Sequence, residues 1–133
     1  MLYHRPYAIE FNHCDPAGIV FYPRYFEMTN HICENFFREV VGVPFAAMMA
    51  QKAGVPTVRI EVDFRNPSRL GDVLDVTLQI KKIGRSSLLV EIAATCLGEH
   101  RLTVALTLCW MSGMAAAPWP DAMRAKLQAH MTA

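Results

Sequence analysis

The 133-residue sequence has no long hydrophobic run, little charge of either sign and no excess of basic residues. No uninterrupted apolar stretch reaches the roughly 18–20 residues that span a bilayer, and the first residues lack the apolar core of a secretory signal. We therefore expect no membrane span and a cytoplasmic location. The formal net charge of +1 also gives no electrostatic basis for holding nucleic acid, so we expect no nucleic-acid partner.

The sequence also lacks paired cysteines. Its four cysteines form no CxxC pair, and in a reducing cytoplasm we expect free thiols rather than two disulfides. Histidine, cysteine and aspartate side chains do gather in one region, but without any recognised metal-ligand spacing. They are His13, Cys14, Asp15, His31 and Cys33. The sequence therefore predicts no metal site.

Apolar side chains are what the sequence has in excess, at 53% of residues against 19% charged. There is no repeat, low-complexity tract or flexible linker, so the chain is predicted to form a single domain over residues 1–133. Since no membrane span accounts for the surplus of apolar side chains, we assign that surplus to subunit interfaces.

Apolar spacing predicts a short strand followed by one long helix. Residues 4–13 alternate as a strand, whereas over residues 22–40 the apolar side chains recur every three to four positions. Pro23 suits the first turn of that helix and Gly42 suits its end. Two shorter helices are also predicted. They cover about 44–52 and 119–130.

Four longer segments alternate between apolar and polar residues, as half-buried antiparallel strands do. They cover 58–64, 74–81, 88–96 and 102–110. The order of elements predicts an α+β fold in which a curved, five-stranded antiparallel sheet wraps around one long α-helix. Such a sheet leaves its edges open, so we expect it to pair with a second subunit.

The most specific motif is DPAGIVFYP, at residues 15–23. It resembles the signature of the 4-hydroxybenzoyl-CoA thioesterase family, enzymes of hotdog fold that hydrolyse acyl-CoA thioesters. RNPSRLGD at residues 65–72 and GRSS at residues 84–87 resemble turns found more broadly among hotdog thioesterases. The resemblance implies an acyl-CoA substrate, with an aromatic, 4-hydroxybenzoyl-like acyl group first. It also implies no cofactor, an active site at a subunit interface and a homotetramer built from dimers.

By this resemblance, Asp15 is the catalytic carboxylate and acts as a nucleophile or as a general base toward water. The backbone N–H of Tyr22, near the start of the helix, would polarise the thioester carbonyl. Gly18 has no side chain and would let the backbone approach the substrate closely. A structural alternative for Asp15 is a helix N-cap or an Asx turn, which an Asp-Pro pair favours.

Other residues near Asp15 have alternative interpretations. His13 would share a face with Asp15 on a continuing strand, where it either assists the acid or is an ordinary exposed histidine. Cys14 would then point away from Asp15, which argues against a thiol nucleophile. Glu27 and Glu34 are alternative acids, although the polar face of the helix also accounts for them.

Binding residues are harder to predict from the sequence. Arg85, Ser86 and Ser87 lie at a predicted turn, and we favour them as the site for the phosphates of coenzyme A. Aromatic side chains around the helix start are candidates for lining an acyl pocket, although their helical spacing also suits a core. They are Phe21, Tyr22, Tyr25 and Phe26.

Two other functions fit the predicted fold. One is a hydratase or dehydratase of acyl thioesters that uses His13 and Asp15 as an acid–base pair. The other is a non-catalytic acyl-CoA-binding protein, because one fold hosts several functions.

Overall fold

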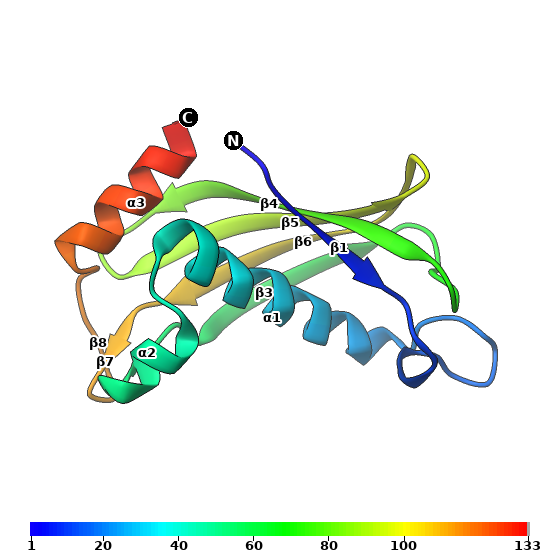
Figure 1. The fold of residues 1–133 in the computed structure, drawn as a ribbon, viewed down its shortest axis with the longest axis horizontal. Helices are drawn as coiled ribbons and strands as arrows, with labels where there is room; N and C mark the ends of the chain where they lie inside the picture. Colours follow the sequence, from blue (N-terminus) through cyan, green and yellow to red (C-terminus); the bar gives the residue numbers. More distant parts are fainter. Residues whose placement is uncertain (133) are drawn as a thin grey trace.

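The computed structural model describes residues 1–132, and its main feature is a five-stranded antiparallel sheet with a long helix across one face (Figure 1). In spatial order the strands are β1 (Tyr3–Ala8), β4 (Val73–Ile83), β5 (Ser87–Cys96), β6 (Glu99–Cys109) and β3 (Thr57–Phe64). This confirms the predicted α+β fold and its sheet of five strands.

One continuous helical segment supplies the layer around which the sheet curves. It consists of the 3₁₀ turn η2 (Tyr22–Arg24), α1 (Tyr25–Phe36) and the π turn η3 (Phe37–Val41). Pro23 lies in the first turn, where its missing N–H costs no helical hydrogen bond. Gly42 ends the segment in the left-handed conformation, with φ of 81°. Both predicted ends of the helix are confirmed.

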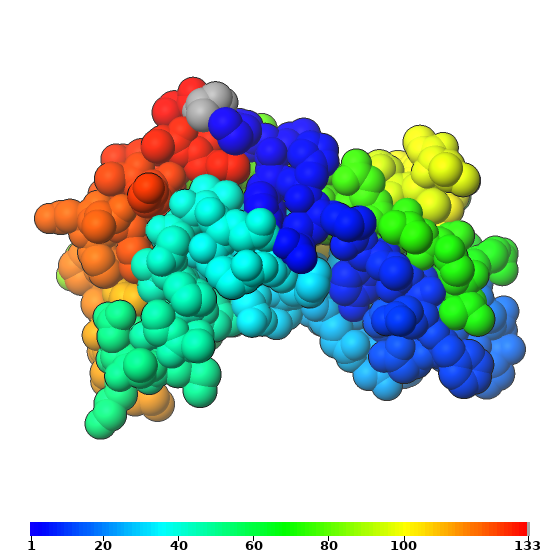
Figure 2. Space-filling view, in the orientation of Figure 1, coloured from blue at the N-terminus to red at the C-terminus, as the bar shows by residue number. Residues whose placement is uncertain are grey.

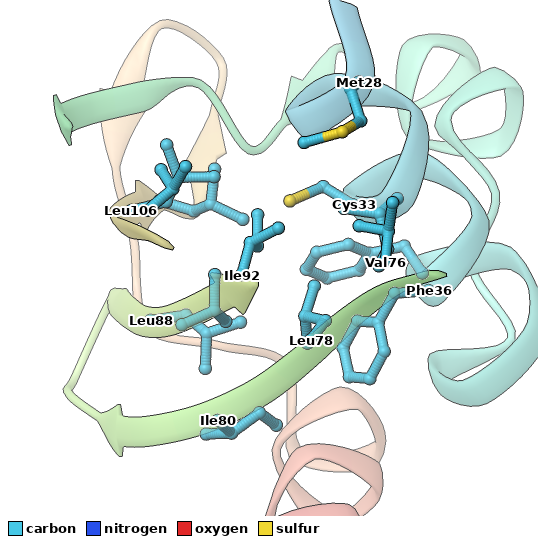
Figure 3. Packing of buried hydrophobic residues seen from close by; sticks show 14 of the residues in the cluster. Met28, Cys33, Phe36, Val76, Leu78, Ile80, Leu88, Ile92 and Leu106 are labelled. Carbon is cyan, nitrogen blue, oxygen red and sulfur yellow. The ribbon is translucent and has the colours of Figure 1, made fainter. Parts of the chain in front are cut away.

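The core lies between this helix and the inner face of β4, β5 and β6. Figure 3 shows Met28, Cys33 and Phe36 of α1 facing strand side chains that include Val76 and Ile92. Phe36 and Ile92 have no exposed surface. Burial of such a side chain contributes about 1.5–3 kcal/mol, so this layer fixes the helix against the curved sheet.

Smaller elements close the end of the sheet that lies farthest from the helix start (Figure 1). They are α2 (Phe45–Ala50), β2 (Ala53–Gly54), β7 (Met111–Ser112), β8 (Ala115–Ala116) and α3 (Asp121–Thr132). Trp119, which is buried, stacks on Phe37 with ring centroids 6.2 Å apart and links the start of α3 to η3. The two shorter helices predicted from the sequence are therefore present, with bounds shifted by a few residues.

The prediction of one strand over residues 4–13 is wrong beyond Ala8. Ile9 makes the last backbone hydrogen bonds between this segment and the residues before β4, from its N–H to Asp72 O (2.8 Å) and to its O from the Gly71 N–H (3.1 Å), and the pairing ends there. Residues Phe11–His13 then form a 3₁₀ turn, η1. The face shared by His13 and Asp15 on a continuing strand does not exist.

The edge strand β3 also differs from its prediction. It alternates and pairs with β6 as expected, but it is exposed along most of its length. Val58, Ile60 and Phe64 keep 61%, 38% and 51% of their surface accessible. An alternating pattern identifies an apolar face, whereas the presence of something to cover it depends on the rest of the assembly. None of the helices within residues 1–132 is long and apolar enough to cross a membrane.

Candidate active site

A tight loop built around Asp15 connects η1 to η2. The Gly18 N–H donates to Asp15 O (2.9 Å), and the Asp15 N–H donates to Ile19 O (3.0 Å). Gly18 has φ of 80°, in the left-handed region that side chains disfavour, and a Cβ there would contact nothing within 4 Å. The backbone conformation of the turn, rather than crowding, therefore requires glycine at this position.

The Asp15 carboxylate is half-buried and is held by the loop itself. Its Oδ1 accepts the Ala17 N–H at 2.9 Å, so the Asx turn predicted as the structural alternative is present. Its second oxygen, Oδ2, has no hydrogen-bond partner within residues 1–132. The carboxylate thus has a fixed orientation and one oxygen available to a substrate or a water molecule.

The Tyr22 N–H is the first amide of the helical segment. Its neighbours are occupied or lack a donor: the Phe21 N–H donates to His13 O (2.9 Å), Pro23 has no N–H, and the Arg24 N–H donates to Phe21 O (2.8 Å). In the part of the chain that the structure describes, the Tyr22 N–H meets no acceptor. An unpaired amide at the positive end of a helix dipole is suited to binding a carbonyl oxygen.

His13 is buried, and its backbone O accepts the Phe21 N–H at the end of the loop. The interpretation as an exposed histidine is therefore wrong. Its Nδ1 accepts the Glu10 N–H at 2.8 Å, and its Nε2 lies 3.2 Å from Tyr7 Oη. Because Nδ1 accepts a backbone N–H, we assign the proton of the neutral ring to Nε2. Both ring nitrogens are thus engaged, and neither contacts Asp15. Burial raises the pKa of Tyr7, which keeps its hydroxyl protonated.

Aromatic side chains surround the loop on the β3 side. Tyr22 and Tyr25 contact Phe64 at the end of β3, with ring centroids 6.4 Å and 5.8 Å apart. Tyr25 is buried, whereas Phe21 keeps 49% and Tyr22 60% of its surface exposed. The groove between the rings of Tyr22, Tyr25 and Phe64 has a volume of about 260 Å³ and extends to Arg65, the one charged residue among residues 1–132 that lines it. We call it the loop groove.

A larger cavity of about 540 Å³ lies at the other end of β3, and we call it the helix cavity. It is bounded by Phe26, Asn30 and Cys33 of α1, Met48 of α2, Ile60 of β3 and Leu108 of β6, among others. No charged side chain of the described residues, 1–132, lines it. Burial raises the pKa of the Cys33 thiol to about 12, so that thiol is neutral near pH 7. Of the four aromatic residues named from the sequence as candidates for an acyl pocket, Phe26 lines this cavity, whereas the rest of its lining was not predicted, because the apolar face of a helix predicts a filled core.

The structure separates Arg85, Ser86 and Ser87 from Asp15 within one chain. They form the β4–β5 turn at the α3 end of the sheet, whereas the Asp15 loop lies at the opposite end (Figure 1). The eleven residues of β4 separate the two ends by roughly 35 Å at about 3.3 Å per residue. The Trp119 N–H donates to Arg85 O (3.0 Å), so the turn also has a structural role.

The alternative acids, the Cys14 thiol and the possible metal ligands named from the sequence show no arrangement that suits catalysis or metal binding. Glu27 forms a salt bridge with Arg24 (2.7 Å), and Glu34 is exposed on α1. The Cys14 thiol lies 3.7 Å from Glu10 O and is free, as are the other three cysteines. Within residues 1–132, no three His, Cys, Asp or Glu side chains are arranged to hold a metal ion.

The sheet wrapped around one helix, with an acid in the loop that leads to a free helix amide, defines a protein of the hotdog class. The chain belongs to the Thioesterase-like superfamily, whose family model matches residues 9–127.

Individual relatives are thioesterases. The chain is 32% identical over 81 residues to a 4-hydroxybenzoyl-CoA thioesterase of Pseudomonas sp. strain CBS-3, a match that covers 59% of this chain and 57% of the relative. The chain spans about three-fifths of the length of the curated relatives it matches. The solved structure of a gentisyl-coenzyme A thioesterase has a TM-score of 0.85 and 26% identity, and the match covers 96% of this chain and 99% of that one. A thioesterase of Thermus thermophilus, complexed with coenzyme A and Zn, has a TM-score of 0.83 and 26% identity over 98% of this chain and 94% of that one.

Proposed function

We propose that this protein is an acyl-CoA thioesterase that converts an aromatic acyl-CoA, of the 4-hydroxybenzoyl type first, to the free acid and coenzyme A. The observation that carries the proposal is the pairing of two groups in one loop. Asp15 has one carboxylate oxygen fixed and one free, and the Tyr22 N–H is an unpaired amide at a helix start. The names of the relatives, thioesterases of 4-hydroxybenzoyl-CoA and gentisyl-CoA, support the substrate class.

In the proposed reaction, the thioester carbonyl oxygen accepts the Tyr22 N–H, which stabilises the negative charge that develops there. One such donor is typically worth ~10²–10³ in rate. Asp15 either attacks the carbonyl carbon, which releases the CoA thiolate and leaves a mixed anhydride for water to hydrolyse, or removes a proton from the attacking water. A thiol of pKa about 8.5 leaves as the thiolate without a general acid. The reaction therefore does not need His13.

We also propose that the catalytic unit is a dimer formed through β3. The opposite edge strand, β1, carries Pro6, which cannot donate a backbone hydrogen bond to a neighbouring strand, whereas β3 has no proline and presents the exposed side chains of Val58 and Ile60. The loop groove and the helix cavity lie at opposite ends of β3. Figure 2 shows the molecule hollowed between the α2 segment and residues 11–24, beneath α1.

Antiparallel pairing of β3 with the same strand of a second copy would place the loop-groove end of one β3 beside the helix-cavity end of the other. In a two-fold dimer, each Asp15 loop would face the helix cavity of the partner. The aromatic acyl group would enter that cavity, which has an apolar lining and the amide of Asn30. The same pairing would bring the partner's β4–β5 turn to the Asp15 end of the sheet, as a phosphate site there requires. A homotetramer would then be two such dimers.

The test is CoA release by the wild type and by Asp15→Asn, over benzoyl, hydroxybenzoyl, phenylacetyl, short-chain and long-chain CoA esters. We expect turnover of the aromatic esters and its loss in Asp15→Asn. That variant keeps an acceptor for the Ala17 N–H and therefore the loop. Glu27→Gln is the matched control, since it removes a nearby surface carboxylate and should retain activity.

Other outcomes would decide against the proposal. Turnover that survives Asp15→Asn would exclude this acid, and binding of CoA esters without turnover would indicate an acyl-CoA-binding protein. The hydratase alternative has no support from the geometry, because the His13 ring is engaged by Glu10 and Tyr7.

A further inference from the structure

Arg101 of β6 is a buried cation that neither the sequence motif nor the proposed reaction uses. It keeps only 9% of its surface exposed. Its Nη1 donates to Asp72 Oδ2 (2.6 Å), Ser68 Oγ (3.2 Å) and Pro67 O (3.2 Å). A guanidinium ion is costly to bury unless its donors are paired. The burial of Arg101 therefore depends on the loop that supplies those three acceptors.

That loop, residues 65–72, is organised around Arg101 along its whole length. At its start, the Arg65 and Asn66 N–H groups donate to Arg101 O (2.8 and 3.1 Å). At its end, Asp72 Oδ2 accepts the Arg69 N–H (2.9 Å) as well as the guanidinium. The Arg101 hydrogen bond lowers the pKa of Asp72, which is therefore ionised at neutral pH. Hydrogen bonds to Arg101 or its partner Asp72 therefore hold both ends of the loop.

The same loop supports the candidate active site directly. Ser68, which is fully buried, accepts Arg101 through Oγ and the Val20 N–H through its backbone O (2.9 Å). Ile19 forms a β-bridge with Arg69, and Ile19 O accepts the Asp15 N–H (3.0 Å). Val20 precedes Tyr22 by two residues. One layer of backbone hydrogen bonds thus separates the Arg101 loop from both groups of the proposed reaction.

We propose that Arg101 and Asp72 are positioning residues, which hold Asp15 and the Tyr22 N–H in their reactive arrangement through Ser68 and residues 19–20. This inference rests on the proposed function. Glu99 approaches the same guanidinium, with Oε1 2.9 Å from Nε but without hydrogen-bond alignment, and it is exposed. It keeps Arg101 partly paired when Asp72 is neutralised, so Asp72→Asn should be milder than removal of the guanidinium.

The first experiment compares kcat and KM for Arg101→Gln, Arg101→Lys and Asp72→Asn on the best CoA ester of the wild type. Small displacements of reacting groups cost up to ~10²-fold, so we expect Arg101→Gln to lower kcat by ~10–10²-fold. KM should change by less than about threefold, since none of these residues lines the helix cavity. Arg101→Lys restores one charged donor and should recover part of kcat. The matched control is Arg5→Gln, which breaks an ion pair with Glu39 at η3, away from the loop.

The second experiment, amide hydrogen exchange of the full-length protein, does not depend on activity. We expect faster exchange of residues 13–22 in Arg101→Gln than in the wild type or Arg5→Gln, with residues 87–96 unchanged. If the wild type hydrolyses no CoA ester, the proposed function fails while exchange still tests the positioning. If folded Arg101→Gln keeps both the wild-type kcat and the wild-type exchange rates, the positioning role of Arg101 is overturned. If Arg101→Gln does not fold, Arg101→Lys and Asp72→Asn supply the same comparison.

Discussion

At the scale of single residues, Asp15 combines a structural role with the proposed chemical one. Its Oδ1 closes an Asx turn with the Ala17 N–H. We expect Asp15→Ala to lose that hydrogen bond and about 1 kcal/mol of stability, whereas Asp15→Asn keeps an acceptor and most of the stability. Both should be inactive in CoA release. Thermal unfolding separates the two roles, and an equal loss of Tm in both variants would contradict this account of the turn.

Gly18 offers a second test of the loop, with Gly42 as its matched control. Both have φ near 80°, and a Cβ at either position would contact nothing within 4 Å. Alanine at each should therefore cost a similar ~1–2 kcal/mol of strain. Only Gly18→Ala should also lower kcat, because only Gly18 lies between Asp15 and Tyr22. Equal kcat values in the two variants would show that the loop tolerates the change without moving Asp15.

What the sequence predicts at this scale depends on how local the determinants are. Pro23 and Gly42 act within one turn of chain, and both predicted positions are confirmed. The His13 ring is buried where the chain leaves β1, against Tyr7 and the Glu10 N–H, and His13 lies in a 3₁₀ turn that strand alternation does not predict. The apolar alternation of residues 4–13 predicts a strand and not this turn, so the interpretation of His13 as exposed was wrong.

At the scale of elements, α3 carries a pH-sensitive contact. His130 is buried, its ring lies 5.1 Å from that of Phe36, and its Nε2 has no hydrogen-bond partner within residues 1–132. Burial lowers its pKa below the ordinary value of 6.5. The unfolded chain therefore binds the proton more tightly. The stability from a neutral His130 is complete above pH 6.5 and is lost as the pH falls through the folded-state pKa.

We therefore expect the Tm of the wild type to fall as the pH is lowered below 6.5, and His130→Leu to reduce that fall. Burial also lowers the pKa of His31, so His31 accounts for part of the remaining slope. The same slope in His130→Leu and the wild type would show that α3 is not the sensitive contact.

Periodicity predicted the strands of the sheet well, because it reports which residues share a face. It did not predict the exposure of β3 or the helix cavity, since both depend on what lies opposite that face. Phe26 and Cys33 have the spacing of core residues, yet they line a cavity of about 540 Å³. An apolar face without a matching layer in the same chain is the signal that distinguishes an interface or a ligand pocket from a filled core.

At the scale of the whole molecule, the exposed β3 edge provides a test of the proposed dimer. Ile60 lies near the middle of the strand and keeps 38% of its surface exposed. A lysine there adds a charge to an edge that would be buried by strand pairing, and edge lysines are a common means of preventing it. We expect Ile60→Lys to be monomeric in size-exclusion chromatography with light scattering, and inactive. A monomeric variant with full activity would show that each chain holds a complete site.

Mixed dimers test whether each site takes residues from two chains. Asp15→Asn removes the acid, and Gly54→Trp fills the helix cavity, where a side chain at residue 54 has open space. Each variant alone should be inactive. In a dimer of one copy of each, the intact Asp15 loop of one chain would face the open cavity of the other, so one site of two is complete. Such dimers, co-expressed with two tags and purified through both, should have about half of the wild-type CoA release. Inactive mixed dimers would instead place Asp15 and its acyl cavity in the same chain, and β3 pairing would then stabilise the molecule without building its site.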